Sequence, residues 1–268
     1  LRALLAQDRV MHVGDAVVFV VAETLEQAIA AADLIEIDYE ELPAVASAAK
    51  ADGAGAVLWP DIAPNNQCFD FLLGDDAKTE AALKTSAKVI ELEIVNNRVV
   101  VNSMEARGAI GDYDAAADKF TLYTTSQGSH GLQAVFGDQV LKCGTDKLRV
   151  VTKDVGGGFG MKIFAYREQG LVMWAAKKVG RPVRWISDRS SAFMSDIQGR
   201  DHVTFARLGL DENNRFTALD VEITANLGAY LSGFATFIPT AAGARMYQGL
   251  YSTPAVAVKS RGYFTNTV

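Results

Sequence analysis

The stretch DVGGGFGMK, residues 154–162, places four glycines and one phenylalanine in five consecutive positions. Residues 147–155 before it are typical of a strand, and residues 166–180 after it have apolar positions at helical spacing. Glycines in such a run permit positive φ and let another group approach the backbone closely. A nucleotide phosphate, a flat cofactor or a tightly packed neighbouring segment could each require this.

Two phosphate-binding motifs do not fit this loop. A P-loop requires GxxxxGK[ST], but Lys162 follows Met161 and precedes Ile163. The dinucleotide motif GxGxxG, started at Gly156 or Gly158, would need its last glycine where Met161 or Ile163 stands. Main-chain N–H donors facing a planar group, or a crossover packed under a neighbouring helix, remain as explanations.

The composition narrows the class of protein. With 268 residues, 49% hydrophobic and 22% charged, the chain is a globular protein of one large or two ordinary domains. A net charge of −6 argues against nucleic acid and against an anionic membrane surface as partners. Cys68 and Cys143 show no spacing typical of disulfide frameworks or zinc sites. No apolar run could span a membrane, and we expect a cytoplasmic protein.

The first third of the chain predicts a small strand-helix-strand unit followed by a connection. Residues 16–23 have the pattern of an apolar strand, and Thr24 with Gln27 forms a capping-box pattern that opens a helix. Residues 34–45 alternate as a second strand. Residues 44–74 are rich in Ala, Gly, Pro, Asp and Asn, which predicts a linker.

The remainder mixes strands and helices without a solenoid-type repeat, so the predicted fold class is α+β, or mixed α/β. A helix is expected to begin at Asp75, and a long hairpin to turn at the sequence DENN. The other expected elements are strands at 89–95 and 98–102, a strand pair around 112–120, a helix at 129–141, a strand at 147–155, a helix at 166–180 and a strand at 182–188.

Several segments, in order along the chain, resemble the large subunit of molybdenum hydroxylases, the family of xanthine dehydrogenase, aldehyde oxidase and aerobic carbon monoxide dehydrogenase. The glycine loop is similar to the family's signature loop for the molybdenum cofactor. The other similar segments are residues 13–45, 96–114, 122–130, 180–202 and 261–268. Together these segments cover nearly the whole chain.

The resemblance implies a division of the chain into three parts. Residues 1–45 would be the C-terminal part of a hammerhead-like first domain, 46–88 a linker and connecting helix, and 89–268 the N-terminal part of the cofactor-binding domain. The chain has no initiator methionine and stops directly after a strand pattern. We therefore expect it to be a fragment of a longer protein, inactive by itself.

The resemblance also implies roles for particular residues. Gln127 would direct its side-chain amide toward the oxo ligands of molybdenum, and Gly158, Phe159 and Gly160 would lie against the metal end of the pterin. Ile163 stands on the substrate side, where xanthine dehydrogenases carry a glutamate that binds the purine. An apolar side chain cannot hydrogen-bond a purine, which favours small, apolar or non-purine substrates.

The implied activity is oxidation of a small carbon substrate with water as the oxygen source. Its cofactor would be molybdopterin, in the cytosine dinucleotide form if the source is bacterial. Its partners would be iron-sulfur and FAD-binding subunits or domains in a dimer of heterotrimers, without nucleic acid or a membrane span. The catalytic base is expected downstream, because Glu105, Glu168 and Asp188 are candidates by residue type only. A non-catalytic cofactor-binding or assembly module on the same scaffold is the alternative.

Overall fold

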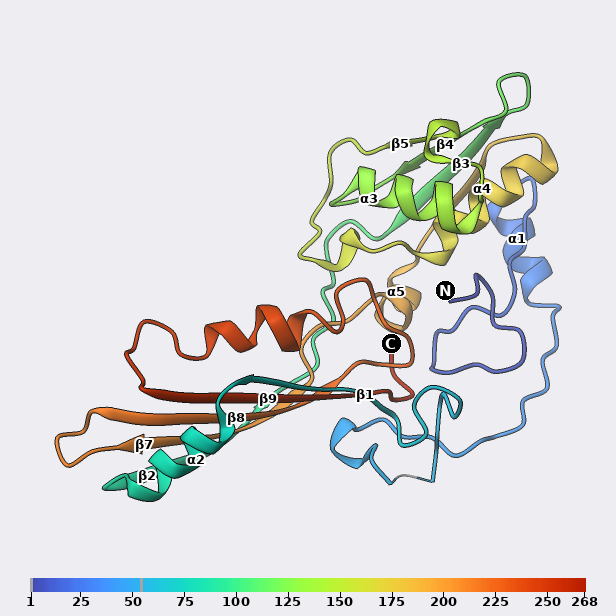
Figure 1. Ribbon diagram of the computed structural model, residues 1–268. Helices are drawn as coiled ribbons and strands as arrows, with labels where there is room; N and C mark the ends of the chain where they lie inside the picture. Colours follow the sequence, from blue (N-terminus) through green and yellow to red (C-terminus); the bar gives the residue numbers. More distant parts are fainter. Residues whose placement is uncertain (1, 54) are drawn as a thin grey trace. The chain divides into compact units, whose positions relative to one another are not determined.

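The computed structural model describes residues 2–53 and 55–268 (Figure 1). These residues form two compact units that alternate along the chain. Unit 1 comprises the residues up to Glu41, Val100–Gln198 and Val268, and unit 2 comprises Leu42–Val99 and Gly199–Thr267. The division into 1–45, 46–88 and 89–268 rests on family resemblance, not on compactness, and stays a prediction.

Unit 1 contains a four-stranded sheet in the order β5-β4-β3-β6, with β4 and β5 parallel and the other neighbours antiparallel. Helix α4 packs on this sheet (Figure 1). Leu122, Phe136, Val172 and Met173 are buried in the hydrophobic core of this unit. The strands are β3 (Gly108–Asp114), β4 (Lys119–Thr124), β5 (Leu148–Val151) and β6 (Val183–Ile186). The helices are α1 (Leu25–Ala32), α3 (Ser129–Ala134, continued by a π-helical turn at Val135–Val140), α4 (Arg167–Val179) and α5 (Arg189–Ser195).

The N-terminal part of unit 1 confirms its predicted helix but not its predicted strands. Helix α1 begins at the capping box, in which the Thr24 hydroxyl accepts from the Gln27 N–H and the Thr24 N–H donates to the Gln27 side chain. The predictions of strands at 16–23 and 34–45 were wrong. A strand needs a continuous ladder of backbone hydrogen bonds to a neighbour, and within 2–53 and 55–268 no ladder joins either stretch to another segment. Single bonds, such as that from the Ala6 N–H to the Ala16 carbonyl at 2.8 Å, do not make a strand.

Unit 2 contains a five-stranded sheet in the order β1-β9-β8-β7-β2. All neighbours are antiparallel except β8 and β9, which are parallel. Helix α2 begins directly after Asp75, where a helix was expected to begin, and the Asp75 carboxylate caps it by accepting from the Lys78 N–H. The elements are β1 (Gln67–Gly74), α2 (Asp76–Thr85), β2 (Lys88–Asn96), β7 (His202–Leu210), β8 (Phe216–Asn226) and β9 (Ala255–Tyr263).

Two further sequence predictions were wrong. Residues 98–102, which run from the end of the first segment of unit 2 into unit 1, do not form a strand; β2 pairs with β7 instead, and within 98–102 only Val99 forms an isolated bridge, to Gly199. The stretch 44–74 is not all linker, since β1 occupies its end and pairs with β9. Both errors concern partners that are distant in sequence.

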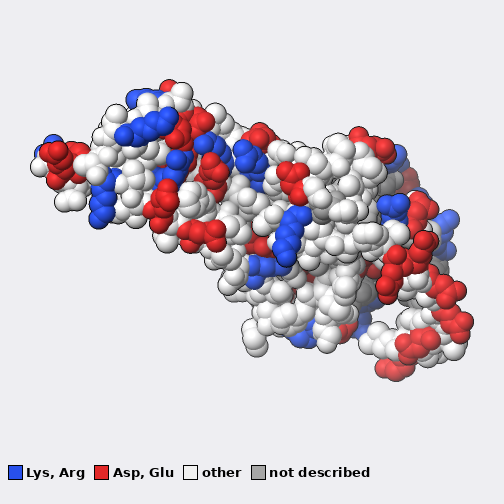
Figure 2. Space-filling view, turned by 90° about the horizontal axis from the view of Figure 1, so that it is seen from below, with Lys and Arg blue, Asp and Glu red and all other residues white. Residues whose placement is uncertain are grey.

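Unit 2 contains a cluster of oppositely charged side chains that pair with one another. Asp76, Glu80 and Asp220 lie close enough together to hold a cation, but Arg207 pairs with Glu80 and Asp220, and Lys259 pairs with Asp76 and Asp220. This cluster is an internal ion-pair network that ties α2 to the sheet. On the face drawn in Figure 2, basic and acidic side chains are intermixed. Within the described ranges, no helix is long and apolar enough to cross a bilayer.

Candidate cofactor-binding loop

The glycine loop makes the predicted turn with positive φ. The φ angles of Gly157, Phe159 and Gly160 are 96°, 50° and 86°. For a bulky residue such as Phe159 this conformation is uncommon and costs on the order of 1–3 kcal/mol. The Phe159 side chain is also 76% exposed, so burial does not offset the strain. An exposed aromatic ring on a strained backbone is a candidate for ligand contact.

Gln127 lies beside this turn, as predicted, and its side chain fixes one end of the loop. Its Oε1 atom accepts hydrogen bonds from the N–H groups of Gly160, at 3.0 Å, and Lys162, at 3.1 Å. The Gln127 N–H in turn donates to the Lys162 carbonyl at 3.1 Å. A Cβ atom on Gly158 would lie 2.5 Å from Cδ of Gln127, so the glutamine packs where only glycine leaves room.

The tip of the loop presents unused hydrogen-bond donors. Among the described residues, none accepts from the N–H groups of Gly157, Gly158 or Phe159. The Nε2 atom of Gln127, on the same amide whose Oε1 atom accepts the two loop bonds, is a further donor. No described residue accepts a hydrogen bond from it. Consecutive N–H groups in a turn with positive φ form a concave site for anions or electronegative atoms.

Glu105 fixes the other end of the loop. Its Oε2 atom accepts from the Gly156 N–H and from the Lys162 ammonium, both at 2.8 Å. Burial of the Glu105 carboxyl opposes its ionisation, but the hydrogen bonds from Lys162 and Gly156 outweigh this and lower its pKa. An ionised carboxylate held in these contacts supports the loop and is poorly suited to act as a base.

The other two carboxylates considered from residue type also have structural contacts. Glu168 pairs with the Arg107 guanidinium at 3.0 Å, and Asp188 caps α5 by accepting from the Ser191 N–H at 2.8 Å. Arg107 is almost fully buried, and it also pairs with Asp196 at 2.5 Å and lies 3.7 Å from the centre of the Tyr166 ring. Neither this network nor the Glu105–Lys162 pair could be inferred from the sequence.

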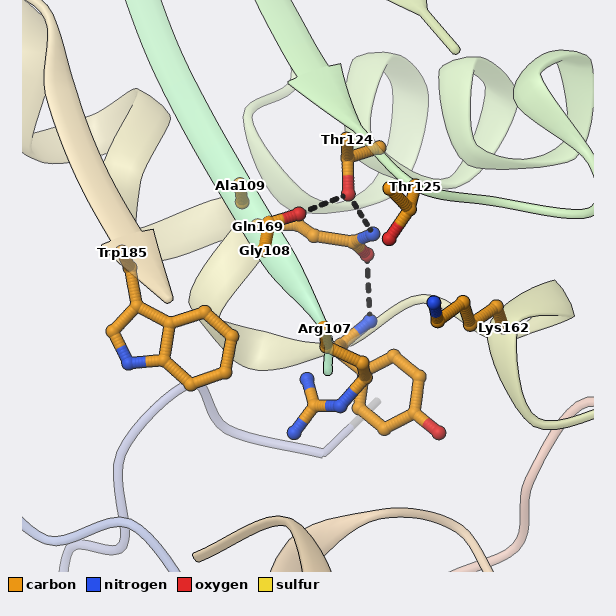
Figure 3. A pocket seen from close by; sticks show the side chains of 9 residues that line it. Arg107, Gly108, Ala109, Thr124, Thr125, Lys162, Gln169 and Trp185 are labelled. Carbon is orange, nitrogen blue, oxygen red and sulfur yellow. Dashed lines mark hydrogen bonds between the residues drawn. The ribbon is translucent and has the colours of Figure 1, made fainter. Parts of the chain in front are cut away.

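A small cavity of about 10 Å³ lies behind the loop in unit 1 (Figure 3). It has room for about one water molecule and is too small for a substrate. The Lys162 ammonium points toward it, and the Gln169 amide donates to the Thr124 hydroxyl at 3.0 Å (Figure 3). Its lining comprises Arg107, Gly108, Ala109, Thr124, Thr125, Lys162, Tyr166, Gln169 and Trp185. Of these residues, Lys162 belongs to the end of the loop, and the Tyr166 hydroxyl donates to the Met161 carbonyl at 3.0 Å.

Ile163 is half-buried at the base of the same loop. Its Cγ1 atom lies 3.7 Å from the position that a Cβ atom on Gly128 would occupy, next to Gln127 in sequence. The structure therefore brings together the residues for which the family resemblance implied a shared site: Gln127, Gly158, Phe159, Gly160 and Ile163.

A turn with free N–H donors and an exposed aromatic ring can bind an electron-rich group through its backbone. Family comparison agrees: residues 60–268 match the molybdopterin cofactor-binding domain. Residues 1–43 match the a/b hammerhead domain of aldehyde oxidase and xanthine dehydrogenase. The chain belongs to the molybdenum hydroxylase large-subunit family, which includes carbon monoxide dehydrogenase, xanthine dehydrogenase and aldehyde oxidoreductase.

Individual relatives show how far the likeness extends. The carbon monoxide dehydrogenase large chain of Hydrogenophaga pseudoflava is 27% identical over 98% of this chain and 34% of its own length. One probable xanthine dehydrogenase subunit of Bacillus subtilis is 32% identical, over 98% of this chain and 34% of the relative. The crystal structure of quinoline 2-oxidoreductase from Pseudomonas putida 86 superposes with a TM-score of 0.93 at 30% identity, over 100% of this chain and 34% of that one. The chain thus spans about a third of the length of these relatives.

Proposed function

We propose that this chain serves in a molybdenum-cofactor-dependent oxidoreductase that oxidises a small carbon substrate with water as the oxygen source. The observation that carries the proposal is the set of free donors at the loop tip, together with Nε2 of Gln127. When bound, the molybdenum cofactor supplies the two-electron redox centre. The residues of this chain contribute its binding and orientation.

The donors fit such a group. The metal end of a molybdopterin carries electronegative oxygen and sulfur atoms, which neutral N–H donors at fixed positions stabilise. Gly158 and Phe159 offer free N–H groups, and the Phe159 ring offers a face or an edge. The Gly160 N–H is already bonded to Gln127, so Gly160 would act through its positive φ and close backbone approach.

The names of the relatives support a protein of several subunits. They describe large chains and subunits, including subunit gamma of a 6-hydroxypseudooxynicotine dehydrogenase complex. We accordingly propose iron-sulfur and FAD-binding subunits or domains as partners, a dimer of heterotrimers, and the cytosine dinucleotide form of the cofactor. The catalytic base would come from outside these 268 residues. A cytoplasmic location stays a prediction from composition.

Gly158→Ala in the whole protein tests the cofactor site. The added Cβ would meet the Gln127 side chain at 2.5 Å, and it must displace that amide from its two N–H partners. Loss of such support typically weakens metal-site affinity about 10–100-fold. We expect a matching loss of molybdenum per protein, measured by mass spectrometry of the metal after dialysis.

Gly131→Ala is the matched control for this substitution. Gly131 lies in α3 of the same unit, and a Cβ there meets no atom within 4 Å. The control should keep its molybdenum. Full molybdenum content in Gly158→Ala would contradict the proposed site, whereas molybdenum without turnover on any substrate in the unmodified protein would favour the non-catalytic module.

Ile163→Glu tests the proposal that Ile163 lies on the substrate side of the site. We expect the unmodified protein to oxidise small aldehydes or carbon monoxide in preference to xanthine, because isoleucine offers the purine no hydrogen bond. A glutamate at this position should raise relative kcat/KM for xanthine by about tenfold or more, the effect of one hydrogen bond to a charged group. Steady-state kinetics with both substrate types decides this, and xanthine preference in the unmodified protein would refute it.

A further inference from the structure

We infer that Lys162 couples the two ends of the glycine loop, so that Glu105 acts as a positioning residue for Gln127. Within the described residues, no hydrogen bond joins the side chains of Glu105 and Gln127 directly. Both residues hydrogen-bond to Lys162 instead, Gln127 to its main chain and Glu105 to its side-chain ammonium. The inference rests on the proposed function only where it concerns cofactor retention, since the coupling itself is a property of the unloaded loop.

Lys162 has separate bonds to each support. Its main-chain N–H donates to Oε1 of Gln127, and its carbonyl accepts from the Gln127 N–H, both at 3.1 Å. Its Nζ atom donates to Oε2 and to the main-chain carbonyl of Glu105, both at 2.8 Å. A change at the lysine side chain therefore acts on the residue whose backbone holds the glutamine.

Because the Lys162 ammonium is buried, the link between Glu105 and Gln127 is sensitive to loss of the Glu105 carboxylate. The Lys162 side chain is 0% exposed, and both acceptors of its ammonium belong to Glu105. Without the carboxylate, the ammonium would keep the main-chain carbonyl of Glu105 as an acceptor, beside a cavity with room for about one water molecule. A buried ammonium without a counter-charge is strongly unfavourable, so Lys162 is driven to move toward solvent. Its backbone lies in the tight turn Met161–Ile163, next to the buried Met161 side chain, which leaves little freedom to move the side chain alone.

The glycine pattern agrees with a loop held at both ends. A Cβ on Gly156 would lie 2.5 Å from the Glu105 Cβ, and one on Gly158 would lie 2.5 Å from the Gln127 Cδ. Each supporting side chain thus packs directly on a glycine of the loop. Between these two contacts, the N–H groups of Gly157, Gly158 and Phe159 are left for a ligand. The spacing of these donors depends on both supports being in place.

Hydrogen exchange in the whole protein, prepared without cofactor, tests the coupling. Residue-resolved mass spectrometry would follow the amides of Gly156, Gly160 and Lys162 in Glu105→Ala. Gly156 loses its acceptor directly, and its faster exchange would be trivial. The coupling predicts that the Gly160 and Lys162 amides, whose acceptor is Oε1 of Gln127, also exchange about tenfold faster.

Three further variants serve as comparisons for Glu105→Ala in the exchange experiment. Glu105→Gln keeps an acceptor oxygen for the Gly156 N–H but removes the counter-charge of the Lys162 ammonium, so Gly156 should keep most of its protection while Gly160 and Lys162 still exchange faster. Gln127→Ala should expose Gly160 and Lys162 while Gly156 stays protected by Glu105. Asp188→Ala removes an exposed helix cap of the same unit and should leave all three amides within about twofold, although it costs stability.

Faster exchange of Gly156 alone in Glu105→Ala would overturn the inference, as would an equal increase over all of unit 1, which signals global unfolding. Molybdenum content of the same variants after cofactor loading is a separate readout. Coupled exchange with unchanged molybdenum would leave the coupling intact and refute the proposed cofactor site. Faster exchange of Gly156 alone in Glu105→Ala, together with loss of molybdenum in Gln127→Ala, would refute the coupling and leave the proposed cofactor site intact.

Discussion

Replacing Arg107 with alanine is expected to lower the free energy of unfolding by about 3–5 kcal/mol. The guanidinium is almost fully buried and pairs with Glu168 at 3.0 Å and with Asp196 at 2.5 Å. Burial disfavours the charged guanidinium, but these carboxylates outweigh it and raise the Arg107 pKa. Removing the arginine leaves two poorly exposed carboxylates without a cation and also removes its stacking on Tyr166.

Urea unfolding followed by circular dichroism measures this effect. Arg107→Lys keeps the charge but loses the planar guanidinium that binds two carboxylates and stacks on a ring. Its free energy of unfolding should therefore lie between those of Arg107→Ala and the unmodified protein. Arg181→Ala is the matched control, because Arg181 and Glu23 are 69% and 68% exposed and such pairs contribute at most about 1 kcal/mol. A similar small loss for Arg107→Ala would show that the network is not needed for stability.

Gly111→Ala is expected to cost about 3 kcal/mol, a large effect for one added methyl group. Gly111 lies in β3 under α4, and a Cβ atom there would collide with the Val172 carbonyl group and lie 2.5 Å from the Met173 nitrogen. These are backbone atoms inside a helix, which cannot rotate away as a side chain can. The helix must therefore separate from the sheet and lose contacts in the core.

Thermal and urea unfolding check this second expectation. Gly131→Ala, which adds the same methyl group in open space, should change stability by less than about 1 kcal/mol. A crystal structure of Gly111→Ala should show α4 displaced from β3. Unchanged stability would mean that the helix and the sheet have room that the structure does not show.

Local signals in the sequence correctly predicted several elements. The capping box at Thr24 and the cap at Asp75 satisfy the free N–H groups of a first helical turn with side chains nearby in sequence. Helix α4 ends where Gly180 adopts a φ of 68°, as its sequence position predicted. The hairpin of β7 and β8 turns at the predicted place. Each of these features depends on residues only a few positions apart.

Predictions failed where a partner lies far along the chain. Strands were expected at 16–23, 34–45 and 98–102 from apolar patterns, but an apolar pattern does not specify a neighbour to bond with. Strand β1 was missed for the opposite reason, because it gains its bonds from β9, nearly two hundred residues later. Within the site, resemblance supplied Gln127 and the loop glycines, while Arg107 and Lys162 carried no local mark of burial.

The sequence by itself determined that residues 154–162 form a glycine-rich turn, since glycine readily tolerates such angles and close contacts, and it determined the family through motifs in a fixed order. The tertiary structure alone decided which side chains meet that turn. Glu105 and Gln127 lie 51 and 33 residues before the loop amides that they accept from, at Gly156 and Gly160. Hydrogen bonds and buried charges act over about 3 Å in space, regardless of separation in sequence, so only the packed fold brings such residues together.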